Sequence, residues 1–192
     1  MATEMTESLI AKFGTQAVEF YQKMSRENAD VMPEQFLGGF IAQKLHAALE
    51  CPVHVERKYS SIANELGIWT PELESQVGGW EADIAIYRDG IPSHIVELKK
   101  LGPLKVVKVD VDKAREIAKW PVSVILGLLV CEDPNRDLRS RKEDVDLELG
   151  STTYFEEPQP SLDGKWYWCF ACHSRNVVRR ELAGEKTAKT AC

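Results

Sequence analysis

The sequence predicts an α/β fold in which a mixed β-sheet is flanked by helices. Two amphipathic segments at helical spacing come first, three strand-like segments follow, and a further helical segment precedes a near-continuous apolar run. An antiparallel start followed by a helical crossover produces a mixed sheet with helices on its faces. With 192 residues, the chain is long enough for one domain with a buried core.

Apolar spacing predicts two helices near the start of the chain. The first covers residues 6–25, where apolar side chains recur every three or four positions. The second begins near Pro33, a residue that suits the first turn of a helix, and its apolar stripe runs to about residue 49. Both helices are therefore amphipathic, with one face to bury.

A strand and a hairpin are predicted next. Residues 53–59 are strand-like, and a long loop with a short turn of helix around 62–66 follows them. Clear strands then cover roughly residues 80–88 and 92–100. The dipeptide Asp89-Gly90 marks the turn between these two strands.

The remaining elements complete the predicted sheet. A helix over residues 110–119 leads to the apolar run at 122–131, which is typical of a central strand buried on both faces. Residues 152–155 and 165–172 predict two further strands, and the charged residues 133–150 predict a loop or an exposed helix. We expect a single domain over residues 1–180 and a flexible tail over residues 181–192.

The length of the hairpin connection decides which acidic residues lie opposite each other. A plain two-residue loop would pair residue 83 with residue 96, whereas one extra residue pairs Asp83 with Glu97. Pro92 disrupts regular pairing after the turn, and the extra residue also unites the apolar side chains of both strands on one face. We therefore expect the extra residue, and an opposite face that carries Glu81, Asp83, Glu97 and Lys99.

Two carboxylates directly across a hairpin lie within about 5 Å of each other, which is unfavourable unless another charge neutralises them. Carboxylate oxygens are ligands that Mg²⁺ and Mn²⁺ prefer. Lys99 would stand beside Glu97 on the same face, so the pattern predicts a divalent-cation site with an adjacent ammonium. The alternative interpretation is an ion-pair ladder of Asp83, Glu97 and Lys99 on a solvated sheet face.

Asp83, followed after thirteen residues by Glu97-Leu98-Lys99, resembles the signature of the PD-(D/E)XK nuclease superfamily. Ala82 stands where that signature usually has a proline. The expected order αβββαβ over about residues 33–131 is also similar to the restriction-endonuclease-like core of the family, here with extra C-terminal strands. The resemblance implies metal-dependent hydrolysis of a phosphodiester bond in nucleic acid, with DNA favoured over RNA.

The resemblance also implies roles for individual residues. Asp83, Glu97 and the Leu98 carbonyl would hold Mg²⁺ or Mn²⁺, and Lys99 would orient the attacking water or stabilise negative charge. Members of the superfamily often add an acid from the first core helix, and Glu34 matches that position best. An acid in the first turn of a helix also complements the helix dipole, so a structural role for Glu34 stays open.

Four other residues have weaker claims to the same site. Glu50 and Gln43 are alternative candidates for the role of Glu34, and Glu81 is a candidate ligand of a second metal ion. His94 alternates to the opposite face of its strand from Glu97, which favours an ordinary surface or core histidine.

Charge is distributed unevenly along the chain. The net charge of −6 gives no general attraction to nucleic acid, yet residues 99–119 hold seven bases and three acids. A basic strip of this kind can bind phosphates, and a solvated helix face is the alternative interpretation. The residues that we expect to contact nucleic acid are Lys100, Lys105, Lys108, Lys113 and Arg115.

The five cysteines and the lack of a secretory pattern at the N-terminus predict free thiols in a cytoplasmic protein. Cys169, Cys172 and His173 spell a sequence found in haem and zinc sites, but positions three apart on a strand face opposite sides. We therefore expect buried cysteines and no metal there. The sequence has no apolar run long enough for a membrane span, so no membrane association is expected.

Three functions stay open from the sequence. The first is an active nuclease, and the second is a catalytically silent nuclease-fold module that binds nucleic acid or a protein. The third is an unrelated α/β enzyme or assembly subunit, which would be favoured if Asp83 and Glu97 pointed to opposite faces. No separate recognition domain is visible in the sequence, so strong sequence specificity would require a homodimer or another partner.

Overall fold

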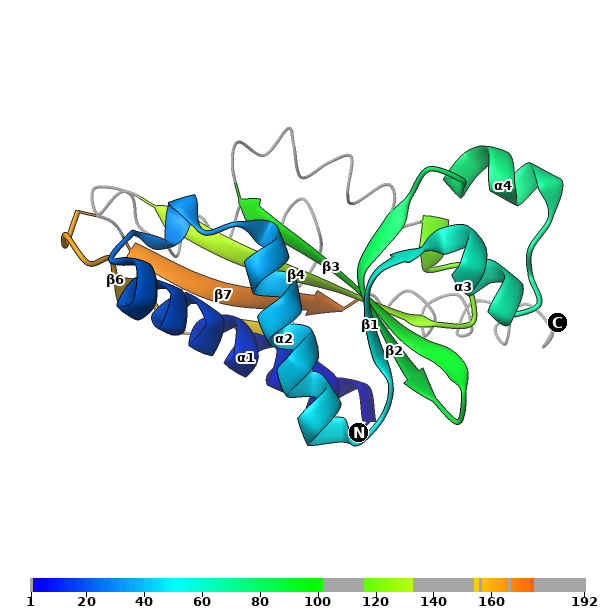
Figure 1. The fold of residues 1–192 in the computed structure, drawn as a ribbon, viewed down its shortest axis with the longest axis horizontal. Helices are drawn as coiled ribbons and strands as arrows, with labels where there is room; N and C mark the ends of the chain where they lie inside the picture. The colour runs from blue at the N-terminus through cyan, green and yellow to red at the C-terminus, as the bar shows by residue number, and fades with distance from the viewer. Residues whose placement is uncertain (1, 102–115, 133–153, 156, 166, 175–192) are drawn as a thin grey trace, which may run out of the picture.

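The computed structural model describes residues 2–101, 116–132, 154–155, 157–165 and 167–174. Its strands are β1 (Val53–Lys58), β2 (Glu81–Arg88), β3 (Ile91–Leu101), β4 (Ser123–Glu132), β5 (Tyr154–Phe155), β6 (Gln159–Pro160) and β7 (Tyr167–Ser174). They form one sheet in the order β1-β2-β3-β4-β7-β5, and β6 pairs with β7 beside this path. Strands β3 and β4 run parallel, whereas the other neighbouring pairs are antiparallel (Figure 1).

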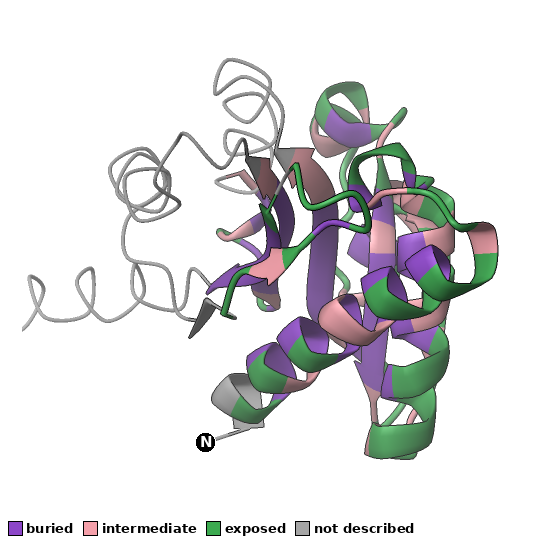
Figure 2. Ribbon diagram, turned by 90° about the vertical axis from the view of Figure 1, so that its left-hand side faces the viewer, coloured by how far each residue is buried: buried purple, intermediate pink, exposed green. Residues whose placement is uncertain are grey.

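Helices cover both faces of the sheet. They are α1 (Ala2–Ser25), the short 3-10 helix η1 (Ala29–Val31), α2 (Glu34–Leu49), α3 (Tyr59–Glu65) and α4 (Pro71–Val77). Buried residues of α1 and α2 cluster with one face of the sheet, and those of α3 and α4 cluster with the other. In Figure 2 the buried positions concentrate on the sheet and on the inward sides of the helices. At 24 residues α1 is the longest described helix, but no described helix is long and apolar enough to cross a membrane.

The packing of α1 against the sheet depends on close contacts around Phe170, whose side chain is fully buried. A Cβ atom on Gly14 of α1 would lie 2.6 Å from the Phe170 ring. A Cβ on Gly127 of β4 would lie 2.7 Å from Leu98 and 3.0 Å from the same ring. The ring therefore occupies the space that these two glycines leave, and this brings the first helix directly onto β4 and β7.

The predicted α/β class and the mixed sheet flanked by helices are confirmed. The two N-terminal helices, the first strand, the hairpin and the central strand all appear within a few residues of their expected bounds. The parallel pairing of β3 with β4 follows from the expected crossover, because parallel neighbours cannot be joined by a tight turn.

Two parts of the prediction were wrong. In the expected long loop after β1, the short turn of helix predicted around residues 62–66 belongs to α3, whereas helix α4 was not predicted. Thr70 caps α4 by accepting a hydrogen bond of 3.1 Å from the Leu73 amide. The strand β6 was also not expected, because two residues carry no periodic signal.

Several predictions fall partly or wholly on residues that the structure does not describe. Of the helix predicted over 110–119, only the last residues are described, and residues 116–117 are helical. The segments 133–150 and 181–192 lie outside the described residues. The described parts of the two C-terminal strands begin two residues later than expected, at Tyr154 and Tyr167.

Candidate functional site

The β2–β3 hairpin contains the extra residue that the sequence predicts. Its turn residues, Asp89 and Gly90, adopt φ angles of +52° and +76°, as a tight hairpin turn requires. The register shifts between Ile86 and Tyr87, so that Ser93 is the extra residue of a β-bulge. The Ser93 hydroxyl donates a hydrogen bond of 3.0 Å to the Ile86 carbonyl, which fixes the bulge from inside the hairpin.

Beyond this bulge the two strands bring the acidic residues to one face. Ile84 pairs with Val96, and the same register continued by one residue sets Asp83 opposite Glu97. Ile84 and Val96 both face α1 and α2, so their neighbours in sequence face the other side of the sheet. Asp83 and Glu97 therefore share the face that α3 covers, as predicted.

Strands β2 and β3 diverge at this point, because the pairing ends at Ile84 and Val96. Figure 1 shows the start of β2 running towards α3 and α4 while the end of β3 runs towards α2. In place of a backbone carbonyl of β2, the carboxylate of Asp83 accepts a hydrogen bond of 2.6 Å from the Leu98 amide. The divergence thus opens the edge of β3 to side-chain oxygens.

A second carboxylate lies along the same edge of β3. Glu34, at the start of α2, accepts a hydrogen bond of 3.4 Å from the Lys100 amide. The amides of Leu98 and Lys100 are two residues apart and point to the same side of the strand, so their spacing is about 7 Å. The predicted proximity of Glu34 to the Asp83 site is thereby supported, while its place in the first turn also suits the helix dipole.

Glu97 is the most deeply buried acid of the group, with 1% of its surface exposed. Its Oε1 accepts a hydrogen bond from the hydroxyl of Tyr59, the first residue of α3, which is fully buried. Burial and then the negative charge of Glu97 raise the pKa of Tyr59 well above its ordinary value, and the charge of Asp83 acts in the same direction. Glu97 therefore does not belong to a solvated ion-pair ladder, and both acids act on the same phenol.

Tyr59 was not recognised from the sequence. Its ring contacts two tryptophans edge-on, with centroid distances of 6.3 Å to Trp80 and 5.7 Å to Trp120. Its backbone amide also donates a hydrogen bond of 3.1 Å to the Trp80 carbonyl. The only signal in the sequence was an aromatic residue at the end of a charged strand, and the partner Glu97 is 38 positions away.

The backbone of β1 is irregular beside Asp83. Val55 pairs with Ile84 and Arg57 with Ala82, so the register sets Glu56 opposite Asp83. Glu56 has a φ of +50°, and it is the one non-glycine residue within the described strands with a positive φ. Backbone strain of this kind is found more often at functional sites than elsewhere, which adds an independent feature to this position.

The two lysines after Glu97 differ in their surroundings. Lys99 pairs with Leu128 of β4 and is half-buried on the face that carries Glu97, as predicted. Lys100 alternates to the other face, and its Nζ donates a hydrogen bond of 3.1 Å to the Asp30 carbonyl. The other expected contacts with nucleic acid, Lys105, Lys108, Lys113 and Arg115, lie outside the described residues.

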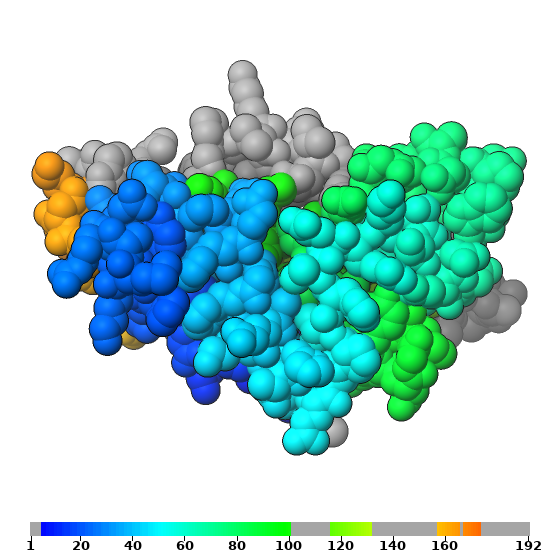
Figure 3. All heavy atoms as spheres, in the orientation of Figure 1, coloured from blue at the N-terminus to red at the C-terminus, as the bar shows by residue number. Residues whose placement is uncertain are grey.

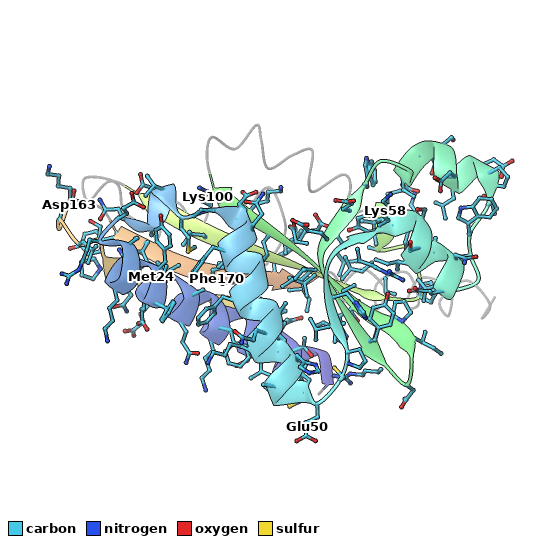
Figure 4. The ribbon with its side chains drawn as sticks, viewed as in Figure 1. Met24, Glu50, Lys58, Lys100, Asp163 and Phe170 are labelled. Atoms are coloured by element: carbon cyan, nitrogen blue, oxygen red, sulfur yellow. The ribbon has the colours of Figure 1, made fainter. Side chains whose placement is uncertain are left out.

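The alternatives to Glu34 do not join this group. Glu50 follows the last turn of α2, and Figure 4 shows it at the opposite end of that helix from Lys100. Gln43 is exposed in the second half of α2. The predictions that Glu50 or Gln43 takes the place of Glu34 were therefore wrong. Glu81 is exposed at the start of β2 and stays an untested candidate.

The histidine and cysteines behave as ordinary interior residues. His94 is buried on the α1–α2 face, and its burial lowers its pKa to about 4. Cys169 packs with the α3 face and Cys172 with the α1–α2 face, so the predicted separation of the two thiols is confirmed. Burial also raises the pKa of Cys169 to about 12, which makes its thiol a poor metal ligand.

The donor set at the β2–β3 divergence fits a hard divalent cation in its chemistry. Among the described residues, no group of three or more His, Cys, Asp or Glu side chains is arranged to hold a metal ion. Mg²⁺ commonly uses one or two carboxylates and keeps several waters, so Asp83 and Glu97 form an adequate protein contribution. The Leu98 carbonyl points to the same strand edge as its amide, towards Asp83, and is a further oxygen donor.

A separate surface hollow lies near the site, and neither Asp83 nor Glu97 lines it. Figure 3 shows green atoms of the β2–β3 region between the blue atoms of α2 and the cyan atoms of α3. A shallow hollow of about 500 Å³ lies on the outer side of α3, lined by Ser60, Ser61, Asn64, Trp69 and Glu74. The buried acid Glu97 and the neighbouring Asp83, rather than this open hollow, therefore mark the chemically distinctive part of the described residues.

Comparison with known proteins adds no relative to this description. No family model, no curated protein and no solved structure matches the chain.

Proposed function

We propose that this protein is a metal-dependent nuclease that hydrolyses phosphodiester bonds in DNA. The observation that carries this proposal is the pair of acids, Asp83 and Glu97, on one sheet face where β2 and β3 diverge. A half-buried lysine, Lys99, follows on the same face. Two acids on one face can hold a divalent cation, and a cation with an ammonium beside it suits the stabilisation of negative charge on a transferring phosphoryl group.

The order and pairing of the strands support a restriction-endonuclease-like core. Helix α2 precedes the antiparallel strands β1, β2 and β3, and the parallel neighbour β4 follows. Asp83 on β2 and the Glu97-Leu98-Lys99 sequence on β3 then occupy the positions of a PD-(D/E)XK signature. The resemblance and the topology thus favour the same family through separate observations.

In the proposed reaction, a water oxygen forms a bond to phosphorus while the bond from phosphorus to the leaving oxygen breaks. The attacking water loses one proton to solvent, and the leaving oxygen takes one proton from solvent. A bound Mg²⁺ or Mn²⁺ would polarise the phosphate and acidify a bound water. Asp83, Glu97 and the Leu98 carbonyl would hold the cation, and Lys99 would orient the water and offset the charge that develops on the phosphate oxygens. Glu34 holds the end of β3 through the Lys100 amide and so positions Lys99.

A catalytically silent nuclease-fold module is the second candidate. The net charge of −6 favours it, because an acidic protein gains no general attraction to DNA. In that case Asp83 and Glu97 have structural roles, such as accepting the hydrogen bonds from the Leu98 amide and from Tyr59. Both candidates predict the same fold, so measurements of metal binding and cleavage separate them.

The deciding experiment measures plasmid and single-strand cleavage with Mg²⁺, Mn²⁺ or EDTA, together with Mn²⁺ binding by calorimetry. We expect cleavage with either metal and none with EDTA. Asp83→Asn should abolish Mn²⁺ binding and cleavage, because it removes one of two anionic ligands. Asp89→Asn in the same hairpin is the matched control, since asparagine also suits that turn. A parent protein that binds Mn²⁺ but cuts nothing would leave the silent module as the better account.

A further inference from the structure

The shallow hollow beside α3 combines one aromatic ring with several polar side chains. Trp69, in the connection between α3 and α4, supplies the ring, and 46% of its surface is exposed. The polar groups are the hydroxyls of Ser60 and Ser61, the amide of Asn64 and the carboxylate of Glu74. The volume of about 500 Å³ falls within the range of about 300–1,000 Å³ that is typical of small-molecule sites.

The ring of Trp69 is held in place although it is exposed. Its Nε1 donates a hydrogen bond of 3.2 Å to Oε2 of Glu74, which belongs to α4. Helices α3 and α4 contact each other, and Figure 1 shows them at one end of the molecule. A ring that is oriented before a ligand arrives loses less conformational freedom on binding, so the hollow offers a prepared stacking surface.

The chemistry of the lining favours an uncharged, flat ligand. Among the described residues that line the hollow, one is an acid and none is a lysine or arginine, so the hollow itself does not suit a phosphate group. A nucleobase has a flat face that stacks on aromatic rings and an edge that forms hydrogen bonds with hydroxyl, amide and carboxylate groups. The ring of Trp69 and the amide of Asn64 match these two parts of a base.

The hollow lies one helix away from the proposed cation site. Tyr59, the first residue of α3, contacts Glu97, and the hollow lies on the outer side of the same helix. An α-helix with its side chains is about 10–12 Å across. Successive nucleotides of one DNA strand are about 3.4 Å apart along the helix axis, so the hollow is about three nucleotides from the site.

We propose that the hollow takes an unpaired base of the DNA substrate, stacked on Trp69, and that the protein therefore prefers DNA with an unpaired nucleotide close to the bond that it cuts. A base inside a duplex has both faces covered by its neighbours, so only an unpaired or flipped-out base can reach the ring. The inference rests on the proposed function, because it names the DNA structure on which the same site would act.

The test uses three DNAs of the same length and sequence. The first is a duplex with one unpaired thymidine, the second has an abasic residue at that position, and the third is fully paired. The first two have the same number of phosphates and the same interruption of the duplex, so they differ only in the base. Affinities are measured by fluorescence anisotropy of a labelled strand in EDTA, where we expect no cleavage. The parent should bind the unpaired thymidine most tightly.

The variants assign this preference to the ring. Trp69→Ala should weaken binding of the unpaired thymidine by about 5-fold or more, as loss of one base–aromatic stack typically does, and leave the other two affinities unchanged. Trp69→Phe keeps an aromatic face and should keep most of the preference. Phe20→Ala is the matched control, because 49% of Phe20 is exposed and it lies on α1, which covers the other face of the sheet.

Tryptophan emission provides a second readout. A base stacked on the Trp69 indole should quench the emission of the parent when the unpaired thymidine binds, and the quenching should be smaller in Trp69→Phe, which lacks this indole. Equal quenching in the two proteins would place the base elsewhere and overturn the role of Trp69. A folded Trp69→Ala variant with the preference of the parent would do the same.

The parent alone also decides the inference if Trp69→Ala fails to fold. Equal affinities for the thymidine and abasic duplexes, or no binding of either, would overturn it, and cleavage with Mg²⁺ would still support the proposed function. A preference for the thymidine duplex without any cleavage would support the base site and favour the silent module over the nuclease.

Discussion

The two faces of the sheet have different chemistry although the same strands build both. Among the described residues, the buried strand residues that face α1 and α2 are apolar apart from His94, and they pack around Phe170. The opposite face combines apolar residues with the buried acid Glu97 and its partner Tyr59. One face therefore mainly supplies stability, and the other holds the charged residues of the proposed site.

The difference arises from the alternation of side chains along β2 and β3. Each apolar residue of the α1–α2 face is followed by a residue of the α3 face, and the bulge at Ser93 sets which residues lie opposite each other. Changes on the first face should affect the free energy of unfolding. Changes at the acids and Lys99 should affect binding or rate while the fold persists.

The largest effect is expected for Phe170→Ala on the α1–α2 face. The ring is fully buried against Gly14 and Gly127, and deletion of such a ring typically lowers the free energy of unfolding by about 3–5 kcal/mol. Urea denaturation measures the change, and Phe20→Ala, with 49% of Phe20 exposed in the parent, is the control. Equal losses for both variants would show that the α1–α2 face is not the main stabilising core.

The second largest effect is the pH dependence of stability that the buried His94 gives to the α1–α2 face. Burial lowers the pKa of His94 to about 4 from an ordinary value of 6.5, with a smaller contribution from the charge of Arg88. The unfolded chain therefore binds a proton before the folded one, so stability is fully present above pH 6.5 and is lost as the pH falls towards 4. Near pH 4 the loss should reach on the order of 3 kcal/mol.

The measurement compares urea denaturation of the parent and His94→Gln at pH 7 and pH 4. Glutamine does not titrate, so the variant should lose less stability on acidification than the parent. An identical loss in both proteins would mean that His94 accepts its proton in the folded state.

The third effect concerns Lys99 on the α3 face. Lys99→Ala should keep the fold, keep or tighten metal binding and still bind DNA, because the ammonium is not a metal ligand. Cleavage should slow by about 10²-fold or more, since the charge that develops in the transition state loses a partner. Single-turnover cleavage at saturating Mg²⁺ measures this step.

Lys100→Ala is the internal control for Lys99 and has the smallest expected effect. Its side chain points to the other face and bonds the Asp30 carbonyl, so its loss should change stability by less than about 0.5 kcal/mol and leave the chemical step unchanged. If both lysine variants cut DNA like the parent, Lys99 has no catalytic role.

Most of the fold follows from local patterns in the sequence. Helical spacing gave α1 and α2, the Asp89-Gly90 turn gave the hairpin, and the apolar run at 122–131 gave the buried strand β4. Helix α4 was missed because a capping threonine and a proline begin it in a segment with little apolar periodicity. Its signal was present in Thr70-Pro71, which is a normal start for a helix.

The candidate site was predictable only where the hairpin register determines it. Asp83, Glu97 and Lys99 share a face because one extra residue follows the turn, and Pro92 indicated that residue. Tyr59 and the bond from the Lys100 amide to Glu34 depend on how α2, β1 and α3 meet β3. Contacts between segments that far apart in the sequence leave no local pattern to read.

The contact between α1 and β7 has a consequence for the order in which the protein folds. Gly14 meets Phe170, so the first helix completes its packing only against the last described strand. In a chain made from its N-terminus, the part of the apolar stripe of α1 that packs on Phe170 stays exposed until β7 has left the ribosome. Contacts between such distant segments slow folding and lengthen the time in which apolar surface is open to other chains. The nascent protein should therefore depend on chaperones most strongly while β7 is still being synthesised.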